Sequence, residues 1–164
     1  MPNWPRESIE KLIDAHLPWD EVKIMISEPK DADRFDKYLS ILQERMAWPE
    51  KILLPLAEHL YIVQRNGERF VKCDCGHEFG DYRENWKLRA VLRVRDSEEQ
   101  FAEVGVPHLM SDPAWCELRE FYCPGCAAQL DVEAVVPGYP ILFRFKPDLE
   151  TFYREWLGRE LPEG

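Results

Sequence analysis

The sequence predicts an α+β fold in which N-terminal helices pack on a zinc-ribbon-like antiparallel β-sheet and an aromatic-rich helix ends the chain. Apolar residues recur at helical spacing through the first third and alternate with polar residues from about Leu60 onward. Four of the five cysteines form two closely spaced pairs. We therefore expect an N-terminal helical segment at residues 1–50, a zinc-ribbon-like β domain at 51–146, and a C-terminal docking helix and tail at 147–164.

The composition restricts the class of partner. The 164 residues are 45% hydrophobic and 12% aromatic, which is enough for one buried core. A net charge of −10 disfavours binding to nucleic acid or to an anionic membrane, because both depend on lysine and arginine. The N-terminus MPNWPRESIEKL lacks the apolar run of a signal peptide, and the longest uncharged apolar stretch, residues 134–143, is shorter than the ~20 residues of a membrane span. We expect a cytoplasmic protein that binds neither nucleic acid nor a membrane.

Three helices are predicted in the first third of the chain. Residues 8–17 carry apolar side chains at helical spacing and end at Pro18, and a shorter helix begins near Asp20. Asp31 is the predicted N-cap of a longer helix that ends at the Trp48-Pro49 step. The apolar face of this helix has the spacing i, i+3, i+4, i+7, i+11 and consists of Phe35, Tyr38, Leu39, Leu42 and Met46. We expect these faces to form core.

A β-hairpin is predicted immediately before the first cysteine pair. Residues 61–64 and 69–72 are rich in β-forming side chains and flank Arg65-Asn66-Gly67-Glu68. Asn-Gly between two such segments is the strongest short signal for a hairpin turn. The hairpin places Cys73 at the end of its second strand.

Three further strands are predicted. Residues 87–95 alternate between apolar and basic side chains, which predicts a strand with a basic outer face. Its basic residues are Lys87, Arg89, Arg93 and Arg95. Strands are also predicted at 118–122 and at 130–136, where Asp131 and Glu133 alternate with apolar residues. We expect the acidic face to pair with the basic face across the sheet, worth about 0.2–1 kcal/mol per pair.

Two helices are predicted outside these strands. Residues 97–104 begin with Ser97 as the N-cap, and Gln100 occupies the fourth position of a capping box. Residues 147–157 form an amphipathic helix with a high aromatic content, and Gly158 is its predicted C-terminal cap.

The chemistry concentrates in the two cysteine pairs, Cys73-Asp74-Cys75-Gly76-His77 and Cys123-Pro124-Gly125-Cys126. Each pair follows a predicted strand, so that two turns of a β-sheet can bring four thiolates to one ion. A zinc ion held by four sulfurs is tetrahedral and closed. It contributes folding energy without offering a reactive position.

The first pair has one intervening residue rather than two, which leaves less room for both sulfurs to reach one ion. Three arrangements therefore stay open. The ligands are the four cysteines, or His77 replaces Cys73 or Cys75, or His77 is an accessory donor outside the ligand set. Cys116 is expected to be a buried thiol that binds no metal.

Catalytic interpretations are weaker. A deaminase needs His-x-Glu followed by Pro-Cys-x-x-Cys, but here Glu78 directly follows His77 and Pro124 lies inside the pair. A thioredoxin-like dithiol needs a helix after the pair, whereas the sequence after Ala127 alternates as a strand. A zinc hydrolase using His77 and Glu78 would need an open coordination position. The stronger alternative is an independent zinc-ribbon adaptor that binds another protein or nucleic acid.

No other catalytic set is visible. His16, His59 and His108 stand alone in apolar or helical contexts, and we expect them to serve packing or to lie at the surface. Tryptophan and tyrosine dominate the energetics of protein interfaces. The predicted anchors for partner proteins are Trp4, Trp19, Trp48, Tyr153 and Trp156.

Six segments, taken in order, resemble the γ subunit of the bacterial acetone carboxylase family. They are PKDADRFDKYLSILQERMAWPEKILLPLAEHLYIVQ, KCDCGHEFGDYRENWKL, VLRVRD, REFYCPGC, LDVEAVVPGYPILF and FYREWLG. The resemblance runs from about Ile9 to Gly158, and its most specific parts are the two cysteine segments with their spacing. On the family's motif the metal positions fall on Cys73, Cys75, Cys123 and Cys126, and the single-residue gap belongs to that motif.

The resemblance implies a role in a large complex. Such γ subunits belong to heterohexamers with two copies each of α, β and γ chains, which convert acetone, bicarbonate and ATP to acetoacetate, AMP and phosphate. The large α and β subunits are expected to bind ATP and manganese. This chain would then be the small zinc-bearing subunit, structural or regulatory, without an active site of its own. Acetophenone carboxylase contains a similar small subunit, so the resemblance does not identify the ketone.

Overall fold

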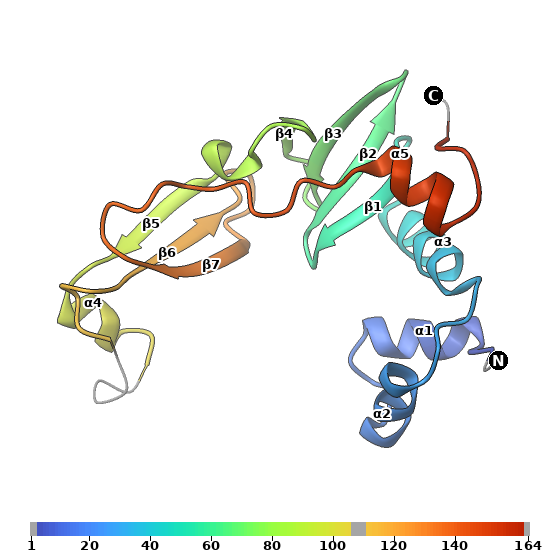
Figure 1. Ribbon diagram of the computed structural model, residues 1–164, viewed down its shortest axis with the longest axis horizontal. Coiled ribbons are helices and arrows are strands. Elements are labelled where there is room, and N and C mark those ends of the chain that lie inside the picture. The colour runs from blue at the N-terminus through green and yellow to red at the C-terminus, as the bar shows by residue number, and fades with distance from the viewer. Residues whose placement is uncertain (1–2, 106–110, 163–164) are drawn as a thin grey trace. The chain divides into compact units, whose positions relative to one another are not determined.

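The computed structural model describes residues 3–105 and 111–162 (Figure 1). Its helices and antiparallel sheets confirm the predicted α+β class. The chain forms two compact units, residues 1–54 and 55–164. No helix within the described ranges is long and apolar enough to cross a bilayer. The functional division at residues 50 and 146 stays a prediction.

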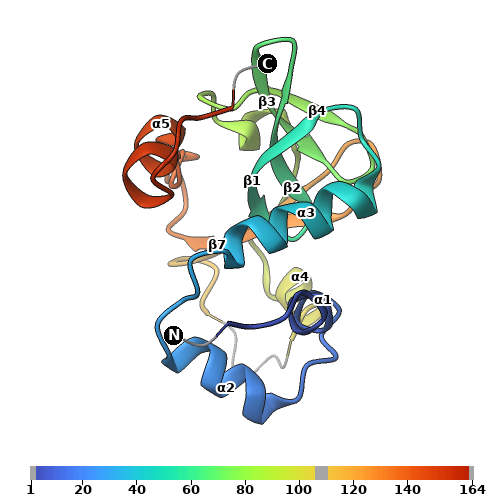
Figure 2. The same ribbon diagram turned by 90° about the vertical axis from the view of Figure 1, so that its right-hand side faces the viewer.

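The first unit contains the three predicted helices, α1 (Arg6–Ile13), α2 (Trp19–Ser27) and α3 (Arg34–Met46) (Figure 2). Each helix, and the turn between the first two, contributes to a small apolar core. Its buried members are Ile9, Leu17, Met25 and Ile41. The predicted apolar face of α3 is confirmed in part, because Leu42 is buried and Tyr38 packs against this core, whereas the buried Ile41 was not on that face.

Two boundaries in the first unit differ from the prediction. α1 ends at Ile13 rather than at Leu17, because Ala15 has a φ of 56°, which a right-handed helix does not contain. Asp31 is not the N-cap of α3, since that position belongs to Asp33. The buried carboxylate of Asp31 instead accepts a hydrogen bond from Nε of Arg34 at 2.5 Å.

The first sheet has the strand order β1-β2-β3-β4 (Figure 1). Its strands are β1 (Lys51–Ala57), β2 (Leu60–Arg65), β3 (Glu68–Cys73) and β4 (Glu78–Asp81). β1 crosses the boundary between the two units. β1 and β4 were not expected, because Pro55 lies within β1 and β4 is only four residues long.

The predicted hairpin is confirmed in β2 and β3. Asn66 and Gly67 have φ values of 51° and 81°, as a two-residue type I′ turn requires. The turn fixes an antiparallel register that runs from Arg65 opposite Glu68 to Leu60 opposite Cys73. Cys73 therefore stands at the end of β3, as predicted.

The second sheet has the order β5-β6-β7 and is antiparallel throughout. Its strands are β5 (Val91–Arg95), β6 (Glu117–Tyr122) and β7 (Gln129–Val135). β6 and β7 match the predicted strands at 118–122 and 130–136. The strand predicted at 87–95 is half wrong, because Trp86–Arg89 form a 3-10 helix, η1, whose start is capped by the Asn85 side chain.

The expected placement of charge on this sheet is confirmed for the exposed Arg89 and Arg93 but wrong for other residues. Lys87 and Arg95 are buried rather than part of an outer basic face, and Glu133 of β7 is buried while Val132 and Ala134 are exposed. The ammonium of Lys87 contacts Asp131 and lies 3.4 Å from Glu133. Pairing between the basic and acidic segments therefore exists, but it lies inside the fold.

The remaining helices follow the prediction with shorter bounds. α4 (Glu98–Ala102) has the expected N-cap, since Oγ of Ser97 accepts from the Gln100 N–H, but the Gln100 side chain bonds the N–H of Asp96 rather than that of Ser97. α5 (Leu149–Thr151) continues into a π-helical turn, η3 (Phe152–Trp156). Gly158 follows this turn with a φ of 65°, as a C-terminal cap requires.

Neighbouring arginines on one face of β5 test the importance of buried charge. Arg95 is 4% exposed and contacts Glu103 and Glu120, whereas the Arg93 side chain is 47% exposed and bonds the same Glu103. Arg95→Met should lower the free energy of unfolding by about 3 kcal/mol, because it leaves the buried Glu120 carboxylate poorly compensated. Arg93→Met is the matched control and should cost less than about 1 kcal/mol. Urea unfolding of the full chain measures both, and equal losses would contradict the assignment of buried charge.

Candidate metal centre

Two turns of the second unit bring the cysteine pairs together. Cys73 ends β3 and Cys75 lies in the turn between β3 and β4. Cys123 follows β6, and Cys126 lies in the turn between β6 and β7. Each sheet therefore contributes one turn with two thiols.

Backbone hydrogen bonds shape the first turn. The N–H of Cys73 donates to the carbonyl of His77 at 2.8 Å, and the N–H of Gly76 donates to the carbonyl of Cys73 at 2.9 Å. Gly76 has a φ of 96°, a conformation that residues other than glycine rarely adopt. The glycine after Cys75 therefore lets the chain reverse while both sulfurs stay on the same side.

The second turn is closed in a similar way. The N–H of Ala127 donates to the carbonyl of Cys123 at 2.8 Å, and the N–H of Cys123 donates to the carbonyl of Ala128 at 2.9 Å. The N–H of Gly125 points at Sγ of Cys123, at 3.3 Å. This contact holds the Cys123 sulfur in place from inside the turn.

The four sulfurs have the spacing of a tetrahedral site. All four lie within 4.8 Å of one another. Sγ of Cys73 is 3.8 Å from Sγ of Cys126, and Sγ of Cys75 is 3.6 Å from Sγ of Cys123. Four sulfurs at about 2.3 Å from a central zinc ion would be about 3.8 Å apart. The donor set and its dimensions therefore fit a closed zinc site.

Gly125 is required by the close approach of the two turns. A Cβ atom at this position would lie 3.2 Å from Sγ of Cys75 and 3.1 Å from Cβ of His77. Both distances are shorter than ordinary van der Waals contacts. The absence of a side chain at Gly125 therefore leaves room for the first turn.

His77 has a packing role in this geometry. Within the described residues, the group that can hold an ion comprises the four cysteines and does not include His77. The His77 ring instead packs edge-on against Phe79, with centroids 4.9 Å apart. Its carbonyl closes the first turn, as described above. Of the three arrangements left open by the sequence, the geometry favours the four-cysteine set.

An aromatic row continues from His77 toward the second sheet. Phe79 packs edge-on against Trp86, with centroids 5.9 Å apart, and Trp86 packs in the same way against Phe121, at 6.4 Å. Phe79 lies in β4, Trp86 in η1 and Phe121 in β6. The two sheets therefore share apolar contacts as well as the cysteine cluster.

Asp74 and His59 adjoin the site, which was not expected. Nδ1 of His59 lies 2.6 Å from Asp74, whose other carboxylate oxygen accepts from the Cys73 thiol at 3.3 Å. The N–H of Asp74 also donates to the carbonyl of His59 at 3.1 Å. His59 is therefore not isolated, and it ties the turn between β1 and β2 to the first cysteine.

Burial divides the thiols into two classes. Cys73 and Cys123 are buried, whereas Cys75 and Cys126 are exposed. Burial raises the pKa of the Cys73 thiol well above its ordinary value. Without a metal ion, Cys73 is therefore protonated at neutral pH, and a bound cation would have to displace that proton.

The other predicted functional residues lie elsewhere. Cys116 is half-buried rather than buried, and it is outside the cysteine cluster. Glu78, the base in a hydrolase interpretation, forms a two-pronged ion pair with Arg65. His108 lies outside the described residues. The hydrolase interpretation therefore has no support in the geometry.

The predicted aromatic anchors separate into two groups. Trp19 and Trp156 are exposed, as an anchor must be. Trp4 and Trp48 are half-buried, and Trp4 packs against the core of the first unit. Tyr153 is buried inside the second unit, so its prediction as an anchor was wrong.

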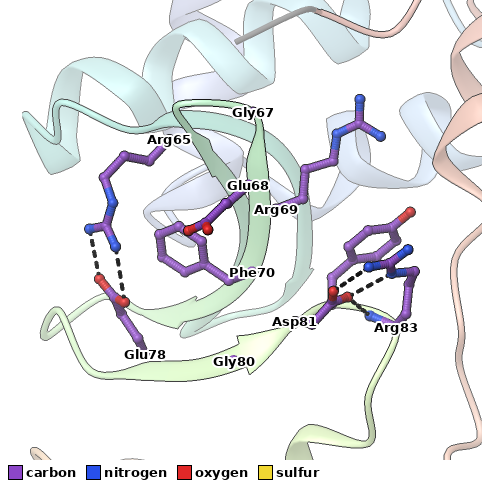
Figure 3. Close-up of a pocket in the computed structure, with 10 residues that line it drawn as sticks. Arg65, Gly67, Glu68, Arg69, Phe70, Glu78, Gly80, Asp81 and Arg83 are labelled. Atoms are coloured by element: carbon purple, nitrogen blue, oxygen red, sulfur yellow. Dashed lines mark hydrogen bonds and ion pairs between the residues drawn. The ribbon is translucent and has the colours of Figure 1, made fainter.

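A hollow of about 560 Å³ lies over β2, β3 and β4, and it shares no residue with the cysteine cluster (Figure 3). Phe70 lies between two ion pairs, Arg65 with Glu78 and Arg83 with Asp81 (Figure 3). Four of the charged side chains that line the hollow are therefore paired with one another.

The comparisons with known proteins agree with this geometry. A profile described as "Acetone carboxylase gamma subunit" matches residues 46–157. The acetone carboxylase gamma subunit of Xanthobacter autotrophicus is 45% identical over 163 residues, which cover 98% of this chain and 96% of the relative. The acetophenone carboxylase beta subunit of Aromatoleum aromaticum is 32% identical over 88 residues, which cover 52% of this chain and 68% of the relative.

Both matches agree with the resemblance read from the cysteine segments. The profile spans all four clustered cysteines, and the Xanthobacter relative aligns over both units. The chain therefore belongs to the acetone carboxylase gamma subunit family.

Proposed function

We propose that this chain is the small, zinc-bearing and non-catalytic subunit of an ATP-dependent ketone carboxylase of the acetone type. The observation that carries the proposal is the alignment with an acetone carboxylase gamma subunit over 98% of the chain. In this role the complex converts acetone, bicarbonate and ATP to acetoacetate, AMP and phosphate. The large α and β subunits provide the sites for ATP and manganese, with two copies of each chain in the assembly.

The zinc ion is proposed to be structural. Cys73, Cys75, Cys123 and Cys126 would supply all four ligands, which leaves no position for water or substrate. When bound, the ion crosslinks the two turns and neutralises thiolate charge. The chain itself orients the ligands, since the Gly125 N–H directs its hydrogen at Cys123 and Gly76 reverses the first turn.

A non-catalytic role is consistent with the rest of the chain. In the described residues, the charged groups that lie close together form internal ion pairs, such as Arg65 with Glu78 and Lys87 with Asp131. A general acid or base requires a group that is free to exchange a proton with substrate. We infer that the chemistry occurs in the large subunits and that this chain supports their assembly.

The proposed site predicts the metal content of the chain. The purified chain should contain about one zinc ion, because four cysteine ligands form one closed site. Cys123→Ala should lose the metal, and Cys116→Ala, a cysteine outside the cluster, should retain it. Elemental analysis of the three proteins measures this. A metal-free wild-type chain, or loss of zinc from the Cys116 variant, would refute the assignment.

The burial of Cys73 predicts the order in which the thiols react. A raised pKa means that less Cys73 is present as thiolate at a given pH, and the thiolate is the reactive form. In the metal-free chain, a maleimide should therefore modify Cys75 and Cys126 before Cys73, and Cys73 should react faster as the pH rises. Zinc should protect all four cysteines while the reactivity of Cys116 stays unchanged. Peptide mass spectrometry gives the order, and early modification of Cys73 would contradict it.

The proposed role predicts that the chain assembles with the large subunits. When the chain is produced together with the two large subunits of the same carboxylase, it should co-purify with them in one high-mass complex. Omission of the chain should abolish or strongly reduce ketone-dependent hydrolysis of ATP. Native mass spectrometry and an activity assay test both points. Large subunits that assemble and act fully without the chain would overturn the proposed function.

A further inference from the structure

His59 and Asp74 extend the pairing of β2 with β3 by one residue beyond the sheet. The last pair of the ladder is Leu60 with Cys73. Beyond it, the N–H of Asp74 donates to the carbonyl of His59 at 3.1 Å, and Nδ1 of His59 lies 2.6 Å from Oδ2 of Asp74. Because an ionised carboxylate only accepts hydrogen bonds, Nδ1 of His59 is the donor. His59 therefore holds Asp74 by both its backbone and its side chain.

Asp74 occupies the position that sets the spacing of the first cysteine pair. It is the single residue between Cys73 and Cys75, so its backbone torsions determine where one sulfur lies relative to the other. Its Oδ1 atom also lies 3.3 Å from Sγ of Cys73. A contact that fixes Asp74 therefore fixes the relative placement of two metal ligands.

The turn that bears His59 is itself firmly placed. The hydroxyl of Tyr61 donates to the carbonyl of Glu58 at 3.1 Å, and Tyr61 and Leu60 are both buried. The side chain of His59 is 36% exposed. His59 thus lies on an ordered part of the chain, from which it can hold a neighbouring turn in place.

The two cysteine turns differ in how they are supported. The hydrogen bonds described above for the second turn join residues of that turn, such as Cys123 with Ala127. The first turn also receives hydrogen bonds from His59, which lies in a different turn. A one-residue spacing between ligands leaves little freedom to adjust to an ion, so correct placement before binding matters more in the first turn than in the second.

We propose that His59 is a positioning residue for the metal site. By holding Asp74, it keeps the first cysteine turn in the conformation that receives a zinc ion. Within the described residues His59 is outside the group that can hold an ion, so it acts through Asp74 rather than as a ligand. The identity of the ion rests on the proposed function, whereas the two contacts of His59 with Asp74 rest on the structure.

Three substitutions of histidine separate this role from a general effect. His59→Ala removes the side-chain donor and keeps the backbone bond to Asp74. His59→Asn keeps an N–H donor at the same distance along the side chain, because Nδ2 of asparagine corresponds to Nδ1 of histidine. His16→Ala is the matched control, since it makes the same change at an exposed histidine of the first unit.

The experiment measures the zinc affinity of the purified full chain by competition with a chromophoric chelator. His59→Ala should bind zinc about tenfold more weakly, since residues that orient metal ligands typically contribute about ten- to hundredfold in affinity. His59→Asn should return to within about threefold of the wild type, because it restores the orienting hydrogen bond. His16→Ala should stay within about twofold, as expected for a surface substitution.

A second pair of variants tests whether His59 acts through Asp74. Once Asp74 is replaced, His59 has no carboxylate to hold, so Asp74→Ala and the double variant Asp74→Ala/His59→Ala should bind zinc equally well. Urea unfolding of the metal-free proteins tests for a general loss of stability. Metal-free His59→Ala should unfold at nearly the same urea concentration as the metal-free wild type, because a partly exposed pair contributes little to global stability.

The outcomes separate this inference from the proposed function. A wild-type chain that binds no zinc would refute the proposed zinc site, and His59 would then have no ion to serve. If the wild type binds zinc and His59→Ala binds it as tightly, the positioning role is wrong and the zinc site stands. The role is also overturned if His59→Asn fails to restore affinity, if the two Asp74→Ala proteins differ, or if metal-free His59→Ala is clearly less stable.

Discussion

The meeting of two hairpin turns at four sulfur atoms is the constraint on which the second unit depends. Sulfurs 3.6 and 3.8 Å apart without a covalent bond give little direct attraction, and as thiolates they would repel. A shared cation would reverse that balance, because it attracts each of the four thiolates. Neighbouring residues also allow the two turns to lie close together. Gly76 reverses the first turn, and Gly125 leaves space for it in the second. The aromatic row of Phe79, Trp86 and Phe121 adds apolar contacts between the sheets.

The second sheet shows where this strongly acidic chain places part of its charge. The second sheet and the neighbouring η1 bury Lys87, Arg95 and Glu133 in internal ion pairs. Such pairs add modest stability but strongly disfavour alternative registers, in which a charge would be left unpaired. Among the described residues the fold buries about as many acidic as basic side chains, so the exposed surface keeps the net negative charge of the sequence. A partner of this chain is accordingly expected to offer basic surface.

The sequence predicted the features that neighbouring residues determine, but it did not predict which face of a strand would be buried. The helical periods, the Asn66-Gly67 turn and the cysteine spacing each state a local geometry, and each appears in the structure. Exposure was misjudged for Arg95 and Glu133, because alternation shows that two faces differ but not which of them is covered. The contact of His59 with Asp74 could have been predicted from the sequence. Counting outward from the type I′ turn pairs Leu60 with Cys73, and the next pair is His59 with Asp74.

The same counting limits how this family can change in length. An inserted residue between Gly67 and Cys73 would move each later side chain of β3 to the opposite face of the sheet, and Cys73 would then point away from its three partners. A substitution in β3 alters one side chain, whereas a single-codon insertion there removes a ligand without changing any cysteine. The short hairpin is therefore expected to keep a constant length among relatives that have the same four cysteines, even where its other residues differ.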